Sequence, residues 1–220
     1  MPDMLAKILL VEDDPVLRLS LSAALLDVGY VVRHAEDGFL ALCEIRHNMP
    51  KILISDLHMP NMSGYELLSV VRRRFPAILT IAMSGAPLED HKSDGITADA
   101  FYAKGGGLRT LLQILQTLQF TEPRSANASS AAEPMWIHRS TNTSPPDAHV
   151  TIACPECLRT FLQALDGLDS RTQKTACIYC HTPIHFILSP SASKKPASVL
   201  QSITNETDPA LKISTQYYYY

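Results

Sequence analysis

Short aliphatic runs alternate with amphipathic stretches along the first 120 residues of the chain. The aliphatic runs lack the polar alternation of a half-exposed strand, so they predict strands that are buried on both faces. The predicted strands cover residues 7–12, 30–33, 51–57, 77–83 and 100–103. Apolar positions at helical spacing, with capping and breaking residues at the ends, predict helices over residues 15–28, 38–48, 64–75, 88–97 and 108–120.

Five strand–helix units in succession predict an α/β fold, in which a parallel sheet carries helices on both faces. In such a sheet, the functional site lies outside the carboxyl ends of the strands. Polar side chains that could carry chemistry follow four of the predicted strands. They are Glu12, Asp13, Asp56, Ser84 and Lys104.

These five side chains suit one kind of chemistry. Converging carboxylates repel one another, and a divalent cation such as Mg²⁺ would relieve the repulsion with hard oxygen ligands. An aspartate beside Mg²⁺ can attack a phosphoryl donor and become an aspartyl phosphate. Ser84 and Lys104 could then hold the other phosphoryl oxygens, so that positioning provides most of the catalysis.

Residues 5–120 resemble the response-regulator receiver family of two-component signalling. The matching segments are ILLVEDDP (8–15), LISDLHMPNMSGYEL (53–67), AMSG (82–85) and FYAKG (101–105). The resemblance implies a flavodoxin-like, doubly wound sheet with five strands in the order 2-1-3-4-5. It also implies a signalling protein that a sensor histidine kinase or phosphotransfer protein phosphorylates. Its own activity would be limited to Mg²⁺-dependent self-phosphorylation and dephosphorylation.

The resemblance assigns a role to each site residue. Asp56 is the phosphoacceptor, Lys104 contacts the phosphoryl group, and Ser84 is the switch hydroxyl. The Mg²⁺ ligands would be Glu12, Asp13, Asp56 and the backbone carbonyl of His58, with Phe101 at the switch-aromatic position and Asp14 as a helix cap. The family usually has proline after the lysine. Here three glycines, 105–107, follow Lys104, so we expect a looser loop that positions Lys104 less well.

Each assignment has a structural alternative. Asp56 could be a structural or capping residue, Ser84 an ordinary turn serine, and Phe101 a permanent part of the core. We further expect residues 72–74, three arginines, to form a solvated helix face, and Cys43 to be a small buried apolar residue.

The rest of the chain divides into three segments. Residues 121–149 are rich in Ser, Thr, Ala and Pro and predict a flexible linker, in which Trp136-Ile137 is an apolar island that could dock elsewhere. Residues 150–188 carry two cysteine pairs, and residues 189–220, which end in four tyrosines, predict a disordered tail. We expect no signal peptide and no membrane span, and therefore a cytoplasmic protein.

The cysteine pairs have the spacing of a zinc site. Cys154 and Cys157 form one C-x₂-C pair, Cys177 and Cys180 form another, and 19 residues separate the pairs. This spacing is typical of four-thiolate zinc sites, and the surrounding sequence resembles a zinc ribbon, a small β module whose fold depends on the metal. Two alternatives are covalent c-type haem at Cys177-Ile-Tyr-Cys180-His181 and a thiol-redox pair.

The sequence says less about what the cysteine module binds. Acidic and basic residues balance between positions 150 and 188, and the whole chain has a net charge of −3. Because DNA affinity depends on cation–phosphate contacts, a neutral module favours protein interaction over nucleic acid. A response regulator with a zinc-binding protein-interaction module is the leading hypothesis. The alternatives are a DNA-binding transcription regulator and a non-phosphorylated pseudo-receiver scaffold.

Overall fold

A computed structural model describes residues 6–85, 98–121, 134–138, 149–165 and 172–189. The helix predicted over residues 88–97, most of the predicted linker and the predicted tail lie outside the described residues. Within them, no helix is both long enough and apolar enough to cross a membrane.

The described residues of the first part of the chain fold as predicted. Its elements are β1 (Lys7–Val11), α1 (Pro15–Asp27), β2 (Val31–Ala35), α2 (Gly38–His47), β3 (Ile52–Asp56), α3 (Gly64–Arg74), β4 (Leu79–Ser84), β5 (Ala100–Ala103) and α5 (Gly107–Gln119). The five strands form one parallel sheet in the order β2-β1-β3-β4-β5. The flavodoxin-like fold with this strand order is therefore confirmed.

Capping residues begin helices α1 and α3 near the positions that the sequence predicts. The Asp14 carboxylate caps α1 by accepting hydrogen bonds from the backbone N–H groups of Val16 and Leu17 at 2.8 and 2.9 Å, and Pro15 occupies the first helical turn. Ser63 and Glu66 form a capping box at the start of α3. Asp14 is thus the helix cap that the sequence predicts.

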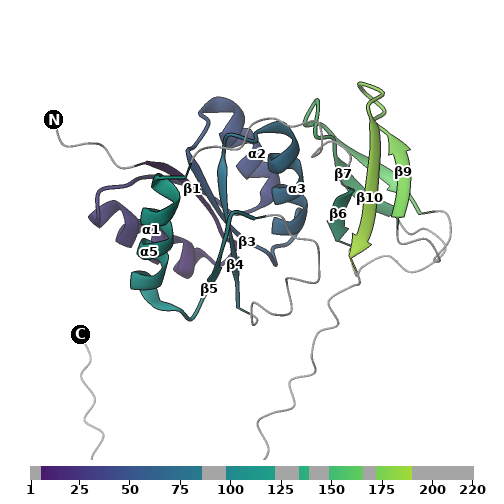
Figure 1. The fold of residues 1–220 in the computed structure, drawn as a ribbon. Coiled ribbons are helices and arrows are strands. Elements are labelled where there is room, and N and C mark those ends of the chain that lie inside the picture. Colours follow the sequence, from purple (N-terminus) through teal and green to yellow (C-terminus); the bar gives the residue numbers. More distant parts are fainter. Residues whose placement is uncertain (1–5, 86–97, 122–133, 139–148, 166–171, 190–220) are drawn as a thin grey trace, which may run out of the picture.

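Alternate strand residues face opposite sides of the sheet and build two cores. Ile8, Leu10, Ile52 and Ile54 pack towards α1 and α5, whereas Leu9 and Leu53 belong to the core on the α2 and α3 side. Figure 1 shows this layered arrangement, with α1 and α5 on one side of the sheet and α2 and α3 on the other.

The C-terminal part is a small β module. It contains β6 (Met135–His138), β7 (His149–Ala153), β8 (Thr160–Ala164), β9 (Thr172–Ala176) and β10 (Pro183–Ser189). β7 and β8 form an antiparallel pair, and a second sheet has the order β6-β10-β9. Because β6 pairs in parallel with β10, residues 135–138 are a strand and not part of a flexible linker, which corrects the prediction for this segment.

β6 packs against α3 and so connects the module to the receiver. Met135 and Ile137 are each 1% exposed and share one core with residues of α2, α3 and the module. The backbone N–H of Trp136 donates a hydrogen bond to Ser69 Oγ in α3 at 3.4 Å. In Figure 1 the module lies directly beside α3, on the side away from the sheet. The described parts of the two domains therefore share a continuous apolar core.

Two expectations about single residues were wrong. Arg72 is only 8% exposed and forms an ion pair with Asp99 at 3.4 Å, so the three arginines of α3 are not all on a solvated face. Cys43 is exposed, because it lies on the outer side of α2. Both errors concern the face on which a side chain lies, which depends on elements that are distant in the sequence.

Candidate functional site

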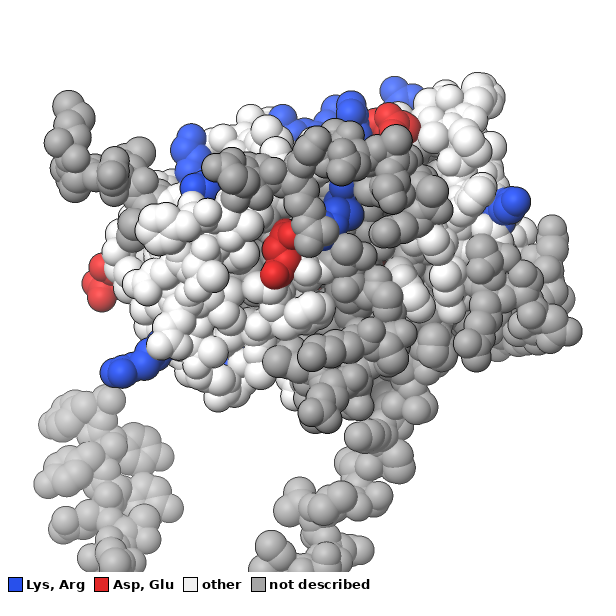
Figure 2. Space-filling view, in the orientation of Figure 1, with Lys and Arg blue, Asp and Glu red and all other residues white. Residues whose placement is uncertain are grey.

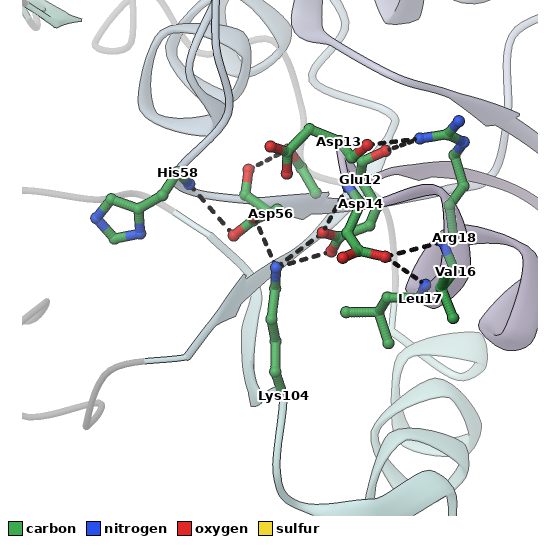
Figure 3. Close-up of polar contacts among 10 residues, drawn as sticks. Glu12, Asp13, Asp14, Val16, Leu17, Arg18, Asp56, His58 and Lys104 are labelled. Carbon is green, nitrogen blue, oxygen red and sulfur yellow. Dashed lines mark hydrogen bonds and ion pairs between the residues drawn. The ribbon is translucent and has the colours of Figure 1, made fainter. Parts of the chain in front are cut away.

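Three carboxylates meet at the carboxyl edge of the sheet. Glu12 and Asp13 follow β1, and Asp56 is the last residue of β3. One oxygen from each of the three lies within 4.8 Å of the others. Figure 3 shows the three side chains turned towards one another. Glu12 is fully buried and Asp56 is 3% exposed, so these two carboxylates have little water to screen their charges, whereas Asp13 is more accessible.

Lys104 brings a positive charge into this cluster. Its Nζ lies 2.7 Å from Asp56 Oδ2 and 2.9 Å from Glu12 Oε1 (Figure 3). The Lys104 backbone N–H donates to the Ser84 carbonyl at 2.9 Å, which ties the end of β5 to the end of β4. The three glycines after Lys104 therefore do not keep its ammonium away from Asp56.

The electrostatics favour an additional cation. Burial raises the pKa of Glu12, although the hydrogen bond from Lys104 partly offsets the effect. Burial alone would lower the pKa of Lys104, but hydrogen bonds to Asp56 and Glu12 outweigh it and raise the value. Glu12 Oε2 is buried, and its ion-pair partner is Lys104 Nζ at 2.9 Å, the same ammonium that contacts Asp56 Oδ2. Three carboxylates facing one ammonium suit a hard divalent ion such as Mg²⁺.

Two positioning residues had no assigned role in the sequence analysis. Arg18 in α1 donates hydrogen bonds to the backbone carbonyls of Glu12 and Asp13, the latter at 3.1 Å, and so fixes the acidic turn. Gly64 starts α3 so close to β3 that a Cβ there would lie 1.9 Å from the Asp56 carbonyl oxygen. For Gly64, the sequence did carry a signal, namely a glycine at the start of a predicted helix. Nothing in the sequence indicated Arg18.

Ser84 and Phe101 lie beside the cluster, on the neighbouring strands. Ser84 is 1% exposed at the end of β4, one residue beyond Met83, which pairs with Asp56. Phe101 in β5 is half-buried against the core on the α2 and α3 side. The His58 backbone N–H donates to Asp56 Oδ1 at 3.2 Å and orients the carboxylate. The structure thus brings the predicted site residues to one edge of the sheet.

The four cysteines of the C-terminal module form a second cluster. Cys154 Sγ is 3.6 Å from Cys180 Sγ, and Cys157 Sγ is 3.7 Å from Cys177 Sγ. All four sulfurs lie within 4.8 Å of one another. Disulfide sulfurs are about 2.05 Å apart, whereas four thiolates bound to one zinc ion are about 3.8 Å apart, given Zn–S bonds of about 2.3 Å. The cluster is therefore compatible with zinc.

The two cysteine pairs sit in matching turns. In one turn the Leu158 N–H donates to the Cys154 carbonyl, and in the other the His181 N–H donates to the Cys177 carbonyl, both at 2.9 Å. Leu158 and His181 each follow a pair and have φ values of 57° and 59°. Burial raises the pKa of the Cys154 thiol to about 12. Because metals bind thiolates, such a buried ligand needs a cation to lose its proton.

Comparisons with known proteins identify the first part of the chain. Residues 8–116 match the family model of the response regulator receiver domain. The chain is 32% identical over 114 residues to the response regulator protein FleR of Pseudomonas aeruginosa, a match that covers 51% of this chain and 24% of FleR. It is 30% identical over 128 residues to the response regulator Rre1 of Synechocystis sp., covering 56% of this chain and 55% of Rre1. The chain thus spans less than two thirds of these curated relatives.

A solved structure gives the same assignment. The receiver domain of the sensor histidine kinase PA1611 from Pseudomonas aeruginosa, which has a magnesium ion coordinated in its active site cleft, is 25% identical with a TM-score of 0.50. The match covers 53% of this chain and 99% of that domain. Receiver domains bind Mg²⁺ and are phosphorylated by sensor histidine kinases. Residues 8–116 of this chain are therefore a response regulator receiver domain of two-component signalling.

Proposed function

We propose that this protein is a response regulator that accepts a phosphoryl group on Asp56 and signals through its C-terminal cysteine module. The observation that carries the proposal is the contact of Lys104 Nζ with Asp56 Oδ2 at 2.7 Å inside a buried acid cluster. This contact places an ammonium beside the carboxylate where the phosphoryl group would arrive. The donor would be a sensor histidine kinase or a phosphotransfer protein.

In the proposed reaction, a carboxylate oxygen of Asp56 attacks the phosphorus of a phosphohistidine. The new P–O bond forms as the P–N bond breaks, and the imidazole leaves with the electron pair. Glu12, Asp13, Asp56 and the His58 carbonyl would hold Mg²⁺, which supplies charge neutralisation when bound. Lys104 and Ser84 would hold the remaining phosphoryl oxygens. Phe101 would move inward as Ser84 shifts towards the phosphoryl group.

The C-terminal module would be the output element. Cys154, Cys157, Cys177 and Cys180 would bind one structural Zn²⁺, because their sulfur separations are close to those of a four-thiolate tetrahedron. The neutral charge of residues 150–188 favours a protein target over nucleic acid. A cytoplasmic location would suit both the reduced thiols and the kinase partner.

Native mass spectrometry of the full chain tests both sites at once. The zinc-loaded protein is incubated with Mg²⁺ and acetyl phosphate, beside an Asp56→Asn variant. We expect one phosphoryl group on the wild type, none on the variant and one zinc ion on both. Equal uptake by the variant would refute the assignment of Asp56. The absence of uptake at every Mg²⁺ concentration would favour the pseudo-receiver scaffold.

A further inference from the structure

A groove runs along the seam between α2 and the first cysteine turn, residues 154–159. It consists of two hollows of about 400 and 480 Å³. Arg46 of α2 and Leu158 of the turn line both hollows, so the two hollows adjoin at these side chains. Because one wall belongs to the receiver and the other to the module, the groove exists only when the two are docked.

The floor of the groove is apolar and its rim is basic. Leu42 and Ile45 are buried at its base, and Leu158 is half-buried beside them. Arg46, Arg159 and Arg74 stand exposed around it, and Glu156 is its lone carboxylate among the lining residues. Figure 2 shows lysine and arginine side chains gathered along the upper edge of the molecule, above the place where α2 and the module meet.

The rim arginines are available to a ligand. Elsewhere in the described structure, Arg33 pairs with Glu44 and Arg72 pairs with Asp99. No described carboxylate lies within ion-pair distance of Arg46, Arg74 or Arg159. The Arg159 guanidinium lies 5.3 Å from the centre of the Tyr179 ring, and this cation–π contact holds it at the rim.

We infer that the groove binds a short acidic peptide segment of a partner protein, with one or more apolar side chains inserted between the arginines. Arginine forms paired, charge-assisted hydrogen bonds with carboxylates, and arginine and tyrosine are enriched among the residues that dominate protein interfaces. The apolar floor and the nearby Glu156 suit a peptide better than nucleic acid, which needs an extended row of cations. The inference rests on the proposed output role of the module, but its test does not involve Asp56.

Fluorescence anisotropy with the zinc-loaded full chain tests the inference. The probe is a fluorescein-labelled ten-residue peptide in which pairs of glutamates flank pairs of leucines. A lysine-for-glutamate version and a labelled DNA duplex serve as competing ligand classes. Arg46→Glu and Arg159→Glu remove rim charges from opposite walls. Arg109→Glu is the matched control, because Arg109 is exposed on α5, on the other side of the sheet.

We expect the acidic peptide alone to bind, and each rim variant to weaken binding at least about tenfold. The Arg109→Glu variant should bind like the wild type, and circular dichroism should show all variants folded. Binding of the acidic peptide that survives both rim substitutions would overturn the inference, as would no binding at all or tighter binding of the lysine peptide or the duplex. Phosphoryl uptake on Asp56 is measured separately, so failure of the groove and failure of the phosphoacceptor are distinguishable.

Discussion

Ile137→Ala tests whether β6 really joins the two parts of the chain. Ile137 is 1% exposed and lies in the core shared by α3 and the module. Truncation removes the side chain beyond Cβ, and at about 0.8 kcal/mol for each buried methyl or methylene group this forfeits about 2.4 kcal/mol. The cavity that remains raises the expected loss of stability to about 3 kcal/mol.

Trp136 makes this loss observable, because it is the chain's single tryptophan and lies in β6. Its fluorescence follows docking of the module, while far-UV circular dichroism follows mainly the helices of the receiver. In urea, the zinc-loaded wild type should give coincident transitions with the two probes. In Ile137→Ala the fluorescence midpoint should fall by about 1.5 M, with an m-value near 2 kcal/mol/M, and precede the loss of helix.

Leu115→Ala is the matched control for this experiment. Leu115 is fully buried in α5 and belongs to the core on the opposite side of the sheet. Its truncation should lower the stability of the receiver. The fluorescence transition of Trp136 should not then precede the circular dichroism transition of the helices. A loss below about 1 kcal/mol in Ile137→Ala, or coincident transitions in that variant, would show that β6 does not join the two cores.

Three further substitutions have expected outcomes. Gly64→Ala should destabilise the protein by more than about 2 kcal/mol in urea and reduce phosphoryl uptake, because its Cβ would lie 1.9 Å from the Asp56 carbonyl oxygen; unchanged stability would contradict the close approach. Cys177→Ser should abolish retention of zinc in native mass spectrometry, whereas zinc retained at full occupancy would argue against a four-thiolate site. Asp99→Ala should cost about 3–5 kcal/mol in chemical denaturation, because it leaves the buried Arg72 charge without this partner, and adding Arg72→Met should recover part of the loss.

The sequence predicted the receiver well for a physical reason. Strands that are buried on both faces read as aliphatic runs such as residues 51–57, and glycine, proline and capping residues such as Asp14 separate them from the helices. The carboxyl ends of parallel strands must meet at one edge, so the sequence alone predicts that Glu12, Asp56 and Lys104 lie together. Fold and candidate site therefore followed from local patterns and one topological rule.

Contacts between distant elements were not predictable in this way. β6 is four residues long, and its parallel partner β10 lies about 50 residues further along the chain. Its only local signal was the apolar pair Trp136-Ile137. Arg72 can be buried because Asp99, which is far away in the sequence, forms an ion pair with it. The seam groove combines residues of α2 and the first cysteine turn, and no sequence pattern relates those two segments.

The position of α3 gives the proposed signal a physical route. Its first residue, Gly64, packs on the backbone of Asp56, and Ser69 contacts β6. One rigid element therefore touches the candidate phosphoacceptor and the module. Linkage makes any such coupling reciprocal: phosphorylation can change docking of the module only by as much free energy as docking changes phosphorylation. A variant that loosens docking, such as Ile137→Ala, must then also alter the phosphorylation equilibrium at Asp56 if α3 carries the signal, and must leave it unchanged if the two sites are independent.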